Sequence, residues 1–522
     1  MANLPEPVHL DGRTLEGGGQ LVRNALALSA LTGQPVSIHH IRVNRKGKRG
    51  LKGSHLAAVK LLAEVTGSEV TGAEIGSLSV QFSPQKKRVI SDGVDGDESA
   101  DYPCVDGMTR SFPGRFVRTP KPIQPEYTIR LSTAGSVFLV FQALYPYLLY
   151  AGAFTGWHIK LNLTGGTNVS FSPSYDYIAQ VLIPNFARLG LPRLEVQLQK
   201  RGWATGRVDL GTVTLLIDPL KLPSAEDEVT AEKADGLNSD TNSFPVLSPR
   251  FPSISVNEYQ RGQITRIDIT ILAPDNPVLE PVRSGKGGNG RQKTRNLHRR
   301  KPSSSPKRDS SVVQNHDQGP DQTQQPETIR QYIQNETLKQ LRKNLKHLPP
   351  SAFNLDTNPI HLSGGLSEST IPIEMHTSEP TFHPSQLYIL LVVHTSTGFR
   401  LGRDALFGTH KDETVSGRGK QGGSGKSIQT MEDRIRKLVE RCVDELMEEL
   451  HGSDVGYEPG NRGPLDVHMR DQVVVFEALG RVYSGRKWDR NDGRTQNEDE
   501  KHWSLHTRTA RWVCEEVLGN EW

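Results

Sequence analysis

An order of strands and helices that occurs twice constrains this chain most. Residues 7–83 alternate between strand-like and helix-like apolar patterns, and residues 127–217 repeat that alternation. Each segment predicts a β-α-β-α-β-β unit, which indicates an internal duplication. Each copy would lay two helices on one face of a small mixed sheet, so the predicted fold class is α/β (α+β) with repeated units.

Three expectations within these repeats are specific. The β-branched segment PVSIHHIRV at 35–43 predicts a strand. The longest apolar run, 137–154, contains Gln142, Pro146 and three tyrosines, which favours a buried helix over a membrane span. The polar segment 84–126, punctuated by glycine and proline, predicts an inserted loop between the two copies.

Residues 225–463 predict a second, smaller α/β domain. Its expected strands and helices lie at 263–272, 327–345, 386–394 and 431–450. Within it, residues 283–326 have almost no apolar side chains and cannot bury enough surface to order themselves. From residue 464 the pattern changes again and predicts two further helices.

Charge and cysteine usage narrow the class of protein. The net charge is +4, but residues 283–308 contain ten Lys/Arg and no acidic residue, so the basic character belongs to one tract. The sequence RRKPSSSPKR at 299–308 is either a nuclear localisation signal or a spacer. The three cysteines lie far apart, which predicts a reducing compartment, and the first residues lack a signal-peptide pattern.

The best phosphate-binding candidate is the run from Glu16 through three glycines to Gln20. A glycine turn that enters a helix exposes backbone N–H groups at the positive end of the helix dipole. Arg23 lies one turn further on the same face, and Glu16 could hold a divalent metal beside the phosphate. The alternative is a tight turn with a capping carboxylate.

A basic cluster supports this interpretation. Six of the eleven residues from Arg42 to Lys52 are basic, and none is acidic. Arginines can bind phosphate through paired hydrogen bonds, although a solvated basic loop has the same composition. Two phosphate-suited elements separated by one predicted helix favour a shared site over either element alone.

Other motifs carry less information. The segment Gly422–Ser427 resembles a phosphate-binding loop, but Lys420 occupies the position where that motif needs glycine, so a flexible linker is favoured. His506 precedes a helical pattern, and no spacing selects it among the 17 histidines. Asp471 with Gln472 alone indicates only an ordinary helix start with an acid in its first turn.

Together these pieces resemble the RNA 3′-terminal phosphate cyclase family. The resemblance is carried by LDG, EGGGQLVR, IR-x-x-R, GL, HLAAVKL, STAGS, LVFQALYP, GGTN, DQ and SLHTRTA, at 10–12, 16–23, 41–45, 50–51, 55–61, 132–136, 139–146, 165–168, 471–472 and 504–510. It implies a large domain of three β-α-β-α-β-β repeats, here 1–224 with 464–522, and a smaller inserted domain, here 225–463.

The resemblance also implies a reaction. ATP would drive conversion of an RNA 3′-phosphate to a 2′,3′-cyclic phosphodiester, through a covalent histidyl-AMP and an RNA-adenylate. His506 matches the nucleophile, Glu16 the acidic residue near the metal and triphosphate, and Mg²⁺ or Mn²⁺ the expected cation. The matching phosphate-binding residues are Arg23, Arg42 and Arg45, and the matching nucleotide-pocket residues are Gln142, Pro173, His468, Asp471 and Gln472.

The chain departs from the family pattern at several positions. His468 replaces a tyrosine of the pocket wall, Ser54 replaces a glutamine, and residues 204–208 replace a Pro-x-Gly-Gly-Gly segment. A related cyclase-like protein lacks the histidine and acts in ribosome biogenesis without catalysis, but retention of His506, Glu16 and the three arginines argues against that alternative. A decayed enzyme that still binds RNA ends is a third interpretation, which the sequence does not distinguish from a working enzyme. The expected partners are ATP and RNA with a 3′-phosphate, with no membrane, and the expected location is the nucleus.

Overall fold

The computed structural model describes residues 6–45, 47–84, 123–206, 208–223, 249–278, 326–354, 371–409, 430–451, 463–484 and 503–519. The predicted loop at 84–126 and the basic tract at 283–326 fall almost entirely outside these residues. The segments 299–308 and 422–427 lie outside them as well. The predicted domain boundaries at 224/225 and 463/464 adjoin undescribed segments and stay predictions.

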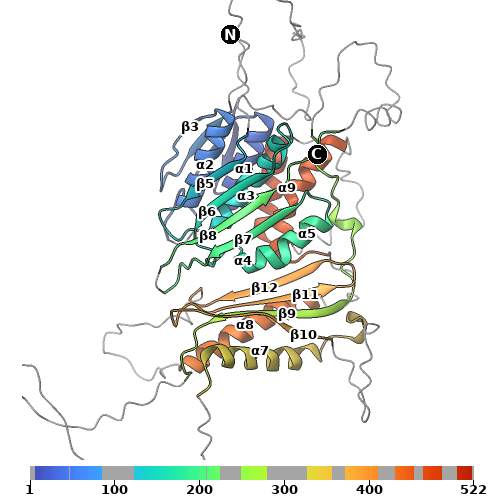
Figure 1. Cartoon of the computed structure of the whole chain (residues 1–522). Coiled ribbons are helices and arrows are strands. Elements are labelled where there is room, and N and C mark those ends of the chain that lie inside the picture. The colour runs from blue at the N-terminus through green and yellow to red at the C-terminus, as the bar shows by residue number, and fades with distance from the viewer. Residues whose placement is uncertain are drawn as a thin grey trace, which may run out of the picture.

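The two copies of the repeat have the same order of elements (Figure 1). The first comprises β1 (Val8–Asp11), α1 (Gly19–Thr32), β2 (Val36–His39), α2 (Gly53–Thr66), β3 (Glu69–Thr71) and β4 (Val80–Ser83). The second comprises β5 (Glu126–Arg130), α3 (Val137–Gly152), β6 (Ile159–Gly165), α4 (Tyr175–Tyr177), α5 (Ile183–Arg188), β7 (Leu194–Lys200) and β8 (Gly211–Ile217). A π-helical turn, η1 (Ile178–Leu182), joins α4 to α5.

Strand topology confirms the predicted duplication. The first sheet has the order β1-β2-β4-β3 and the second β5-β6-β8-β7. In each copy the first two strands pair in parallel and the remaining pairs are antiparallel. Helices α1 and α2 pack against α3, so the two copies share one apolar core.

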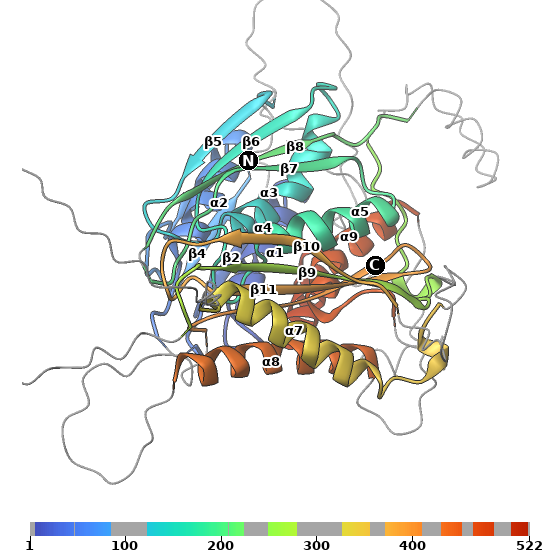
Figure 2. The same ribbon diagram turned by 60° about the horizontal axis from the view of Figure 1, so that its bottom comes forward.

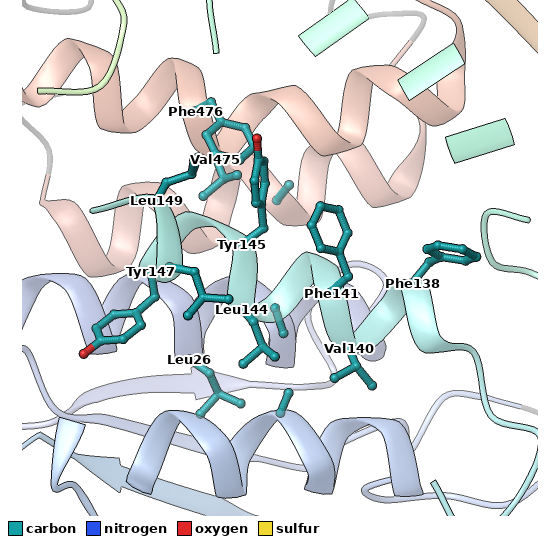
Figure 3. Close-up of a cluster of buried hydrophobic side chains, with 14 of the residues drawn as sticks. Leu26, Phe138, Val140, Phe141, Leu144, Tyr145, Tyr147, Leu149, Val475 and Phe476 are labelled. Atoms are coloured by element: carbon teal, nitrogen blue, oxygen red, sulfur yellow. The ribbon is translucent and has the colours of Figure 1, made fainter. Parts of the chain in front are cut away.

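Helix α3 is the centre of this core, and the apolar run at 137–154 is a buried helix as predicted (Figure 3). The Ser136 hydroxyl accepts a hydrogen bond from the Leu139 N–H and caps the helix. The Tyr145 ring stacks on Phe186 at 5.7 Å and meets Phe476 edge-on at the same centroid distance. Among the described residues, no helix is long and apolar enough to cross a membrane.

The predicted strand at 35–43 is wrong in its second half. Strand β2 ends at His39, and the backbone then turns with φ of +54° at His40 and +59° at Arg42. The Arg42 N–H donates to the Gly17 carbonyl at 2.8 Å. A tertiary contact to the glycine run therefore overrides the strand propensity of this segment.

The smaller domain has one sheet of the order β10-β9-β11-β12. Its elements are β9 (Ile264–Ala273), α7 (Ile329–Leu345), β10 (Ile373–Pro380), β11 (Tyr388–Thr395), β12 (Arg400–Leu406) and α8 (Met431–His451), with short 3-10 turns η2 (Val256–Glu258) and η3 (Pro350–Ala352). Helices α7 and α8 cover the outer face, and the inner face meets α4 and α5 (Figures 1 and 2). The sequence had not indicated β10 or β12, because both mix charged and apolar residues.

Two helices, α9 (Val467–Ser484) and α11 (Leu505–Leu518), join the apolar core of the two repeats. They pack on each other, and α11 also packs on α1. Residues 463–484 and 503–519, the described part of this last segment, contain no strand. Asp471 falls in the second turn of α9, so the prediction that it opens the helix is corrected.

Candidate active site

The glycine run before α1 is needed most at Gly17, where both the backbone angle and a neighbouring carbonyl disfavour a side chain. Gly17 has φ of +59°, and a Cβ there would lie 1.7 Å from the Gly12 carbonyl oxygen. A Cβ on Gly18 would meet the Glu16 carboxylate at 2.2 Å. The glycines therefore let the chain fold tightly around Glu16 and expose the start of α1.

Glu16 is buried, and each of its carboxylate oxygens has one recorded partner. Its carboxylate accepts a hydrogen bond from the Gly18 N–H at 2.7 Å and pairs with the Arg45 guanidinium. Burial would raise the pKa of Glu16, but the charges of His506 and Arg45 outweigh it and hold that pKa below its usual value. Glu16 is therefore an anion at neutral pH.

Helix α11 brings His506 to the same place. The Ser504 hydroxyl caps the helix by accepting from the Thr507 N–H at 3.0 Å. The Thr509 hydroxyl accepts the Glu16 N–H at 3.1 Å, which ties segments 493 residues apart. Burial lowers the pKa of the half-buried His506, while the Glu16 carboxylate opposes the shift. A neutral imidazole, with a lone pair on its unprotonated ring nitrogen, is thus available at neutral pH.

Arg23 and His55 flank the first turn of α1. Burial lowers the pKa of Arg23 to about 10, so it remains charged. His55 is buried, and burial with the neighbouring cations lowers its pKa to about 3. Its Nδ1 accepts the Lys52 N–H at 3.3 Å, so the proton of the neutral ring lies on Nε2. A Cβ on Gly19 would lie 3.0 Å from that Nε2 and 2.7 Å from the Arg23 Nη1.

Within the described part of the basic cluster, Arg45 pairs with Glu16, whereas Arg42 and Lys52 have no recorded ion pair. The buried Nε of Arg42 has no hydrogen-bond partner among the described residues, although its backbone is held in a strained conformation. Burial and the nearby Arg45 charge lower the pKa of Arg42. Burial followed by the charges of Arg42 and Arg45 lowers the pKa of Lys52. Cations packed this closely favour a bound anion.

A small cavity lies beside this cluster, between α1, α3, α5 and α9. Three predicted pocket residues line it, namely Gln142, Asp471 and Gln472, together with Gln20, Arg23, Asn24 and Tyr145. Neither amide atom of Gln142, nor the Tyr145 hydroxyl, has a hydrogen-bond partner in the described residues. Burial raises the pKa of Asp471 to about 7, and the Arg23 charge opposes the shift.

Pro173 and His468 do not line this cavity. Pro173 is half-buried in the loop between β6 and α4. His468 is exposed in the first turn of α9, and its ring meets Tyr177 edge-on at 6.3 Å. Their assignment to a nucleotide pocket stays a prediction, whereas the geometry brings Glu16, Arg23, Arg42, Arg45 and His506 together.

Sequence reasoning missed several residues of this site. Gln20, Asn24, His55, Tyr145 and Thr509 were not predicted as site residues. His55 follows the basic cluster at the start of a helix, and that position could have indicated it. Nothing in the local sequence marks Asn24 or Tyr145, because their place depends on how helices pack.

The acidic side chain of the site, Glu16, suits a metal ion that is held mainly by the substrate. The described residues contain no group of three or more His, Cys, Asp or Glu side chains that could hold an ion. Mg²⁺ is commonly bound through one or two carboxylates and substrate phosphates, so Glu16 alone suits an ion that arrives with a polyphosphate.

The geometry therefore gathers four cations, a buried carboxylate and a histidine on a repeated α/β scaffold, an arrangement suited to a polyanion. A family model described as "RNA 3′-terminal phosphate cyclase" matches residues 14–102 and 108–522. The chain belongs to the RNA 3′-terminal phosphate cyclase family.

Curated relatives with the same description match this chain over part of their length. The cyclase of Desulfurococcus amylolyticus is 36% identical over 195 residues, which cover 37% of this chain and 43% of the relative. That of Korarchaeum cryptofilum is 35% identical over 231 residues, or 44% and 53% of the two chains. A "probable" cyclase of Dictyostelium discoideum is 33% identical over 214 residues, or 41% and 40%. The chain thus spans about half the length of the curated relatives it matches.

Proposed function

We propose that this protein is an ATP-dependent RNA 3′-terminal phosphate cyclase that acts through a covalent histidyl-AMP at His506. The observation that carries the proposal is the convergence of the His506 helix with Glu16, through the Thr509 hydrogen bond and the mutual pKa effects. Four cations, Arg23, Arg42, Arg45 and Lys52, lie around the same point and suit phosphates.

In the first step, the neutral imidazole of His506 attacks the α-phosphorus of ATP. A P–N bond forms, the bond to the bridging oxygen breaks and pyrophosphate leaves. Arg42 and Arg45 offset the charge of the departing group, and the Nε2–H of His55 can donate to it. Mg²⁺ or Mn²⁺ held by Glu16 would add Lewis-acid stabilisation of that charge.

In the second step, an oxygen of the RNA 3′-phosphate attacks the adenylate phosphorus. The P–N bond breaks, His506 is regenerated and AMP is attached to the RNA end. The adjacent ribose 2′-OH then attacks the activated 3′-phosphorus, loses its proton and expels AMP. Because both groups lie on one ribose, this step is intramolecular and gains from proximity. The 2′-OH requirement restricts the substrate to RNA-like ends.

The test is product analysis on a short RNA. With ATP and a 3′-phosphorylated oligoribonucleotide, the wild-type chain should produce a 2′,3′-cyclic end and one AMP per end. His506→Ala should form no cyclic product, but should cyclise a preformed 3′-adenylylated RNA at least weakly. RNA binding without cyclisation by the wild-type chain would favour the non-catalytic alternative related to ribosome biogenesis.

For localisation, we propose that residues 299–308 direct the protein to the nucleus. The support is the composition of RRKPSSSPKR alone. Deleting 283–326 should abolish nuclear accumulation and leave cyclisation of a short oligonucleotide intact. Unchanged nuclear accumulation would contradict the proposed localisation signal. Loss of cyclisation would contradict the prediction that this tract is a spacer with no part in catalysis.

A further inference from the structure

Strand β12 of the smaller domain hydrogen-bonds to the η1 and α5 side of the cavity and to Asp466, the residue that immediately precedes α9. Leu182 and Phe186, from η1 and α5, line one wall, and Asp471 and Gln472, from α9, line another. Residues 400 and 402 of β12 lie two apart, so both face the same side of the sheet. Arg400 contacts the side formed by η1 and α5, and Gly402 contacts the side formed by α9, through Asp466.

Arg400 contacts the α5 wall. Its backbone N–H donates to the Asn185 side-chain oxygen at 2.9 Å, and its carbonyl accepts the Asn185 amide at 2.8 Å. The Arg400 Nη1 donates to the Gln180 carbonyl at 3.0 Å. The Gln180 amide in turn donates to the Thr270 hydroxyl of β9 at 2.9 Å. The π-helical turn beside Leu182 is therefore held by the smaller domain.

Gly402 contacts the α9 wall through Asp466. The Gly402 N–H donates to the Asp466 Oδ2 at 2.8 Å. The Asp466 Oδ1 accepts the N–H groups of His468 and Met469, each at 2.9 Å, and the Tyr177 hydroxyl at 2.8 Å. Asp466 has no solvent exposure. One carboxylate thus caps α9 and joins it to both α4 and the smaller domain.

Close packing makes this junction stiff. A Cβ on Gly402 would lie 2.7 Å from the Tyr177 ring and 2.8 Å from a Val181 methyl group. The strand therefore lies directly against the helix, and Figure 1 shows β12 alongside α4 and α5. Because alternate residues on one face of β12 are bonded to the two sides of the cavity, the strand limits how far these sides can move relative to each other.

We propose that β12 sets the spacing of the nucleotide cavity walls, and that Asp466 is the positioning residue that connects α9 to it. This inference rests on the proposed function for the identity of the ligand, ATP. Asp466 touches no reacting atom. It acts through the register of Asp471 and Gln472, one to two turns further along α9.

Asp466→Asn is the direct test. An amide can keep the cap on α9 with its oxygen, but its NH₂ group then faces the Gly402 N–H, so the link to β12 is lost. The measured reaction is formation of the covalent protein–AMP from ATP labelled in its α-phosphate. We expect the KM for ATP in this reaction to rise at least tenfold, with the maximal rate within about threefold of wild type. Thr270→Val, which keeps the shape and removes the acceptor for Gln180, should raise that KM two- to fivefold.

The control is Thr328→Ala. It removes a comparable cap, the Thr328 hydroxyl that accepts the Gln331 N–H, on α7 at the outer face of the smaller domain. At a similar loss of melting temperature, its KM for ATP should stay within twofold of wild type. A rise equal to that of Asp466→Asn would assign both effects to stability and overturn the proposal.

Calorimetric titration with ATP separates this inference from the proposed function. If the wild-type chain binds ATP but forms no adduct, the proposed function fails, and the ATP affinity of Asp466→Asn still tests the spacing role. An affinity within twofold of wild type for both Asp466→Asn and Thr270→Val would overturn the proposal. A wild-type chain that binds no ATP would also overturn it.

Discussion

The two copies of the β-α-β-α-β-β unit share one topology and differ in what their loops offer. In the first copy, the turn before α1 contains Gly17 with positive φ, and the loop after β2 brings Arg42 and Arg45 to Glu16. In the second copy, the turn before α3 is an ordinary cap by Ser136, and the loop after β6 leads to the contacts with the smaller domain. One framework therefore carries a cation cluster beside a buried carboxylate in one copy and the contacts with the smaller domain in the other.

The sharpest contrast is between Gly17 and Gly135, which precede equivalent helices. Gly17→Ala should destabilise the chain by about 3 kcal/mol or more, because it combines a positive φ with a clash against Gly12. Gly135→Ala should cost less than about 1 kcal/mol, since its nearest contacts of 3.5 Å and 3.9 Å are ordinary. Chemical denaturation of both variants measures the difference, and equal losses would contradict the contrast.

The cations of the first copy provide the next test. Arg42→Ala and Arg45→Ala should each slow cyclisation at limiting ATP by about 10- to 100-fold, because a charge-assisted hydrogen bond contributes about 1.5–3 kcal/mol. Arg130→Ala, at an exposed arginine of the second copy, is the matched control and should leave the rate unchanged. A control as slow as Arg42→Ala would remove the distinction between the copies.

Acid stability should depend on His55 of the first copy. Its folded pKa of about 3 lies below the ordinary value of 6.5, so the unfolded chain takes up the proton first. The neutral buried ring therefore contributes stability above pH 6.5 that is lost as the pH falls toward 3, about 2 kcal/mol by pH 5. In urea titrations at pH 7.5 and 5, His55→Gln should show a smaller loss than wild type. An identical loss of unfolding free energy in the two proteins would contradict the burial of a neutral His55 ring.

The smallest effect is expected at Lys420 and in the segment Gly422–Ser427. Lys426→Ala and Lys420→Ala should leave cyclisation rates unchanged, because the spacing of that segment does not match a phosphate-binding loop. Both residues lie outside the described part of the chain. A large loss of ATP use in Lys426→Ala would show that a second phosphate element exists.

Local sequence predicted the features that depend on local physics. The duplication, the buried helix at α3 and the pairing of the glycine run with the basic cluster all follow from periodicity, composition and spacing. His506 was indicated only by family resemblance, because its role depends on a contact to residues nearly five hundred positions away. Strand β12 was missed because it mixes charged and apolar residues. The Asp466 junction was missed because hydrogen bonds between distant segments leave no periodic pattern.

The central claim is that His506 is the nucleophile, and one labelling experiment tests it most directly. The wild-type chain should become labelled by ATP that carries a radioactive α-phosphate and not by γ-labelled ATP. The bond should be acid-labile and alkali-stable, as a phosphoramidate is, and peptide mapping should place it at His506. His506→Ala should remain unlabelled, while His468→Ala should label at a higher ATP concentration. Normal labelling of His506→Ala, or a label mapped to another residue, would contradict the account.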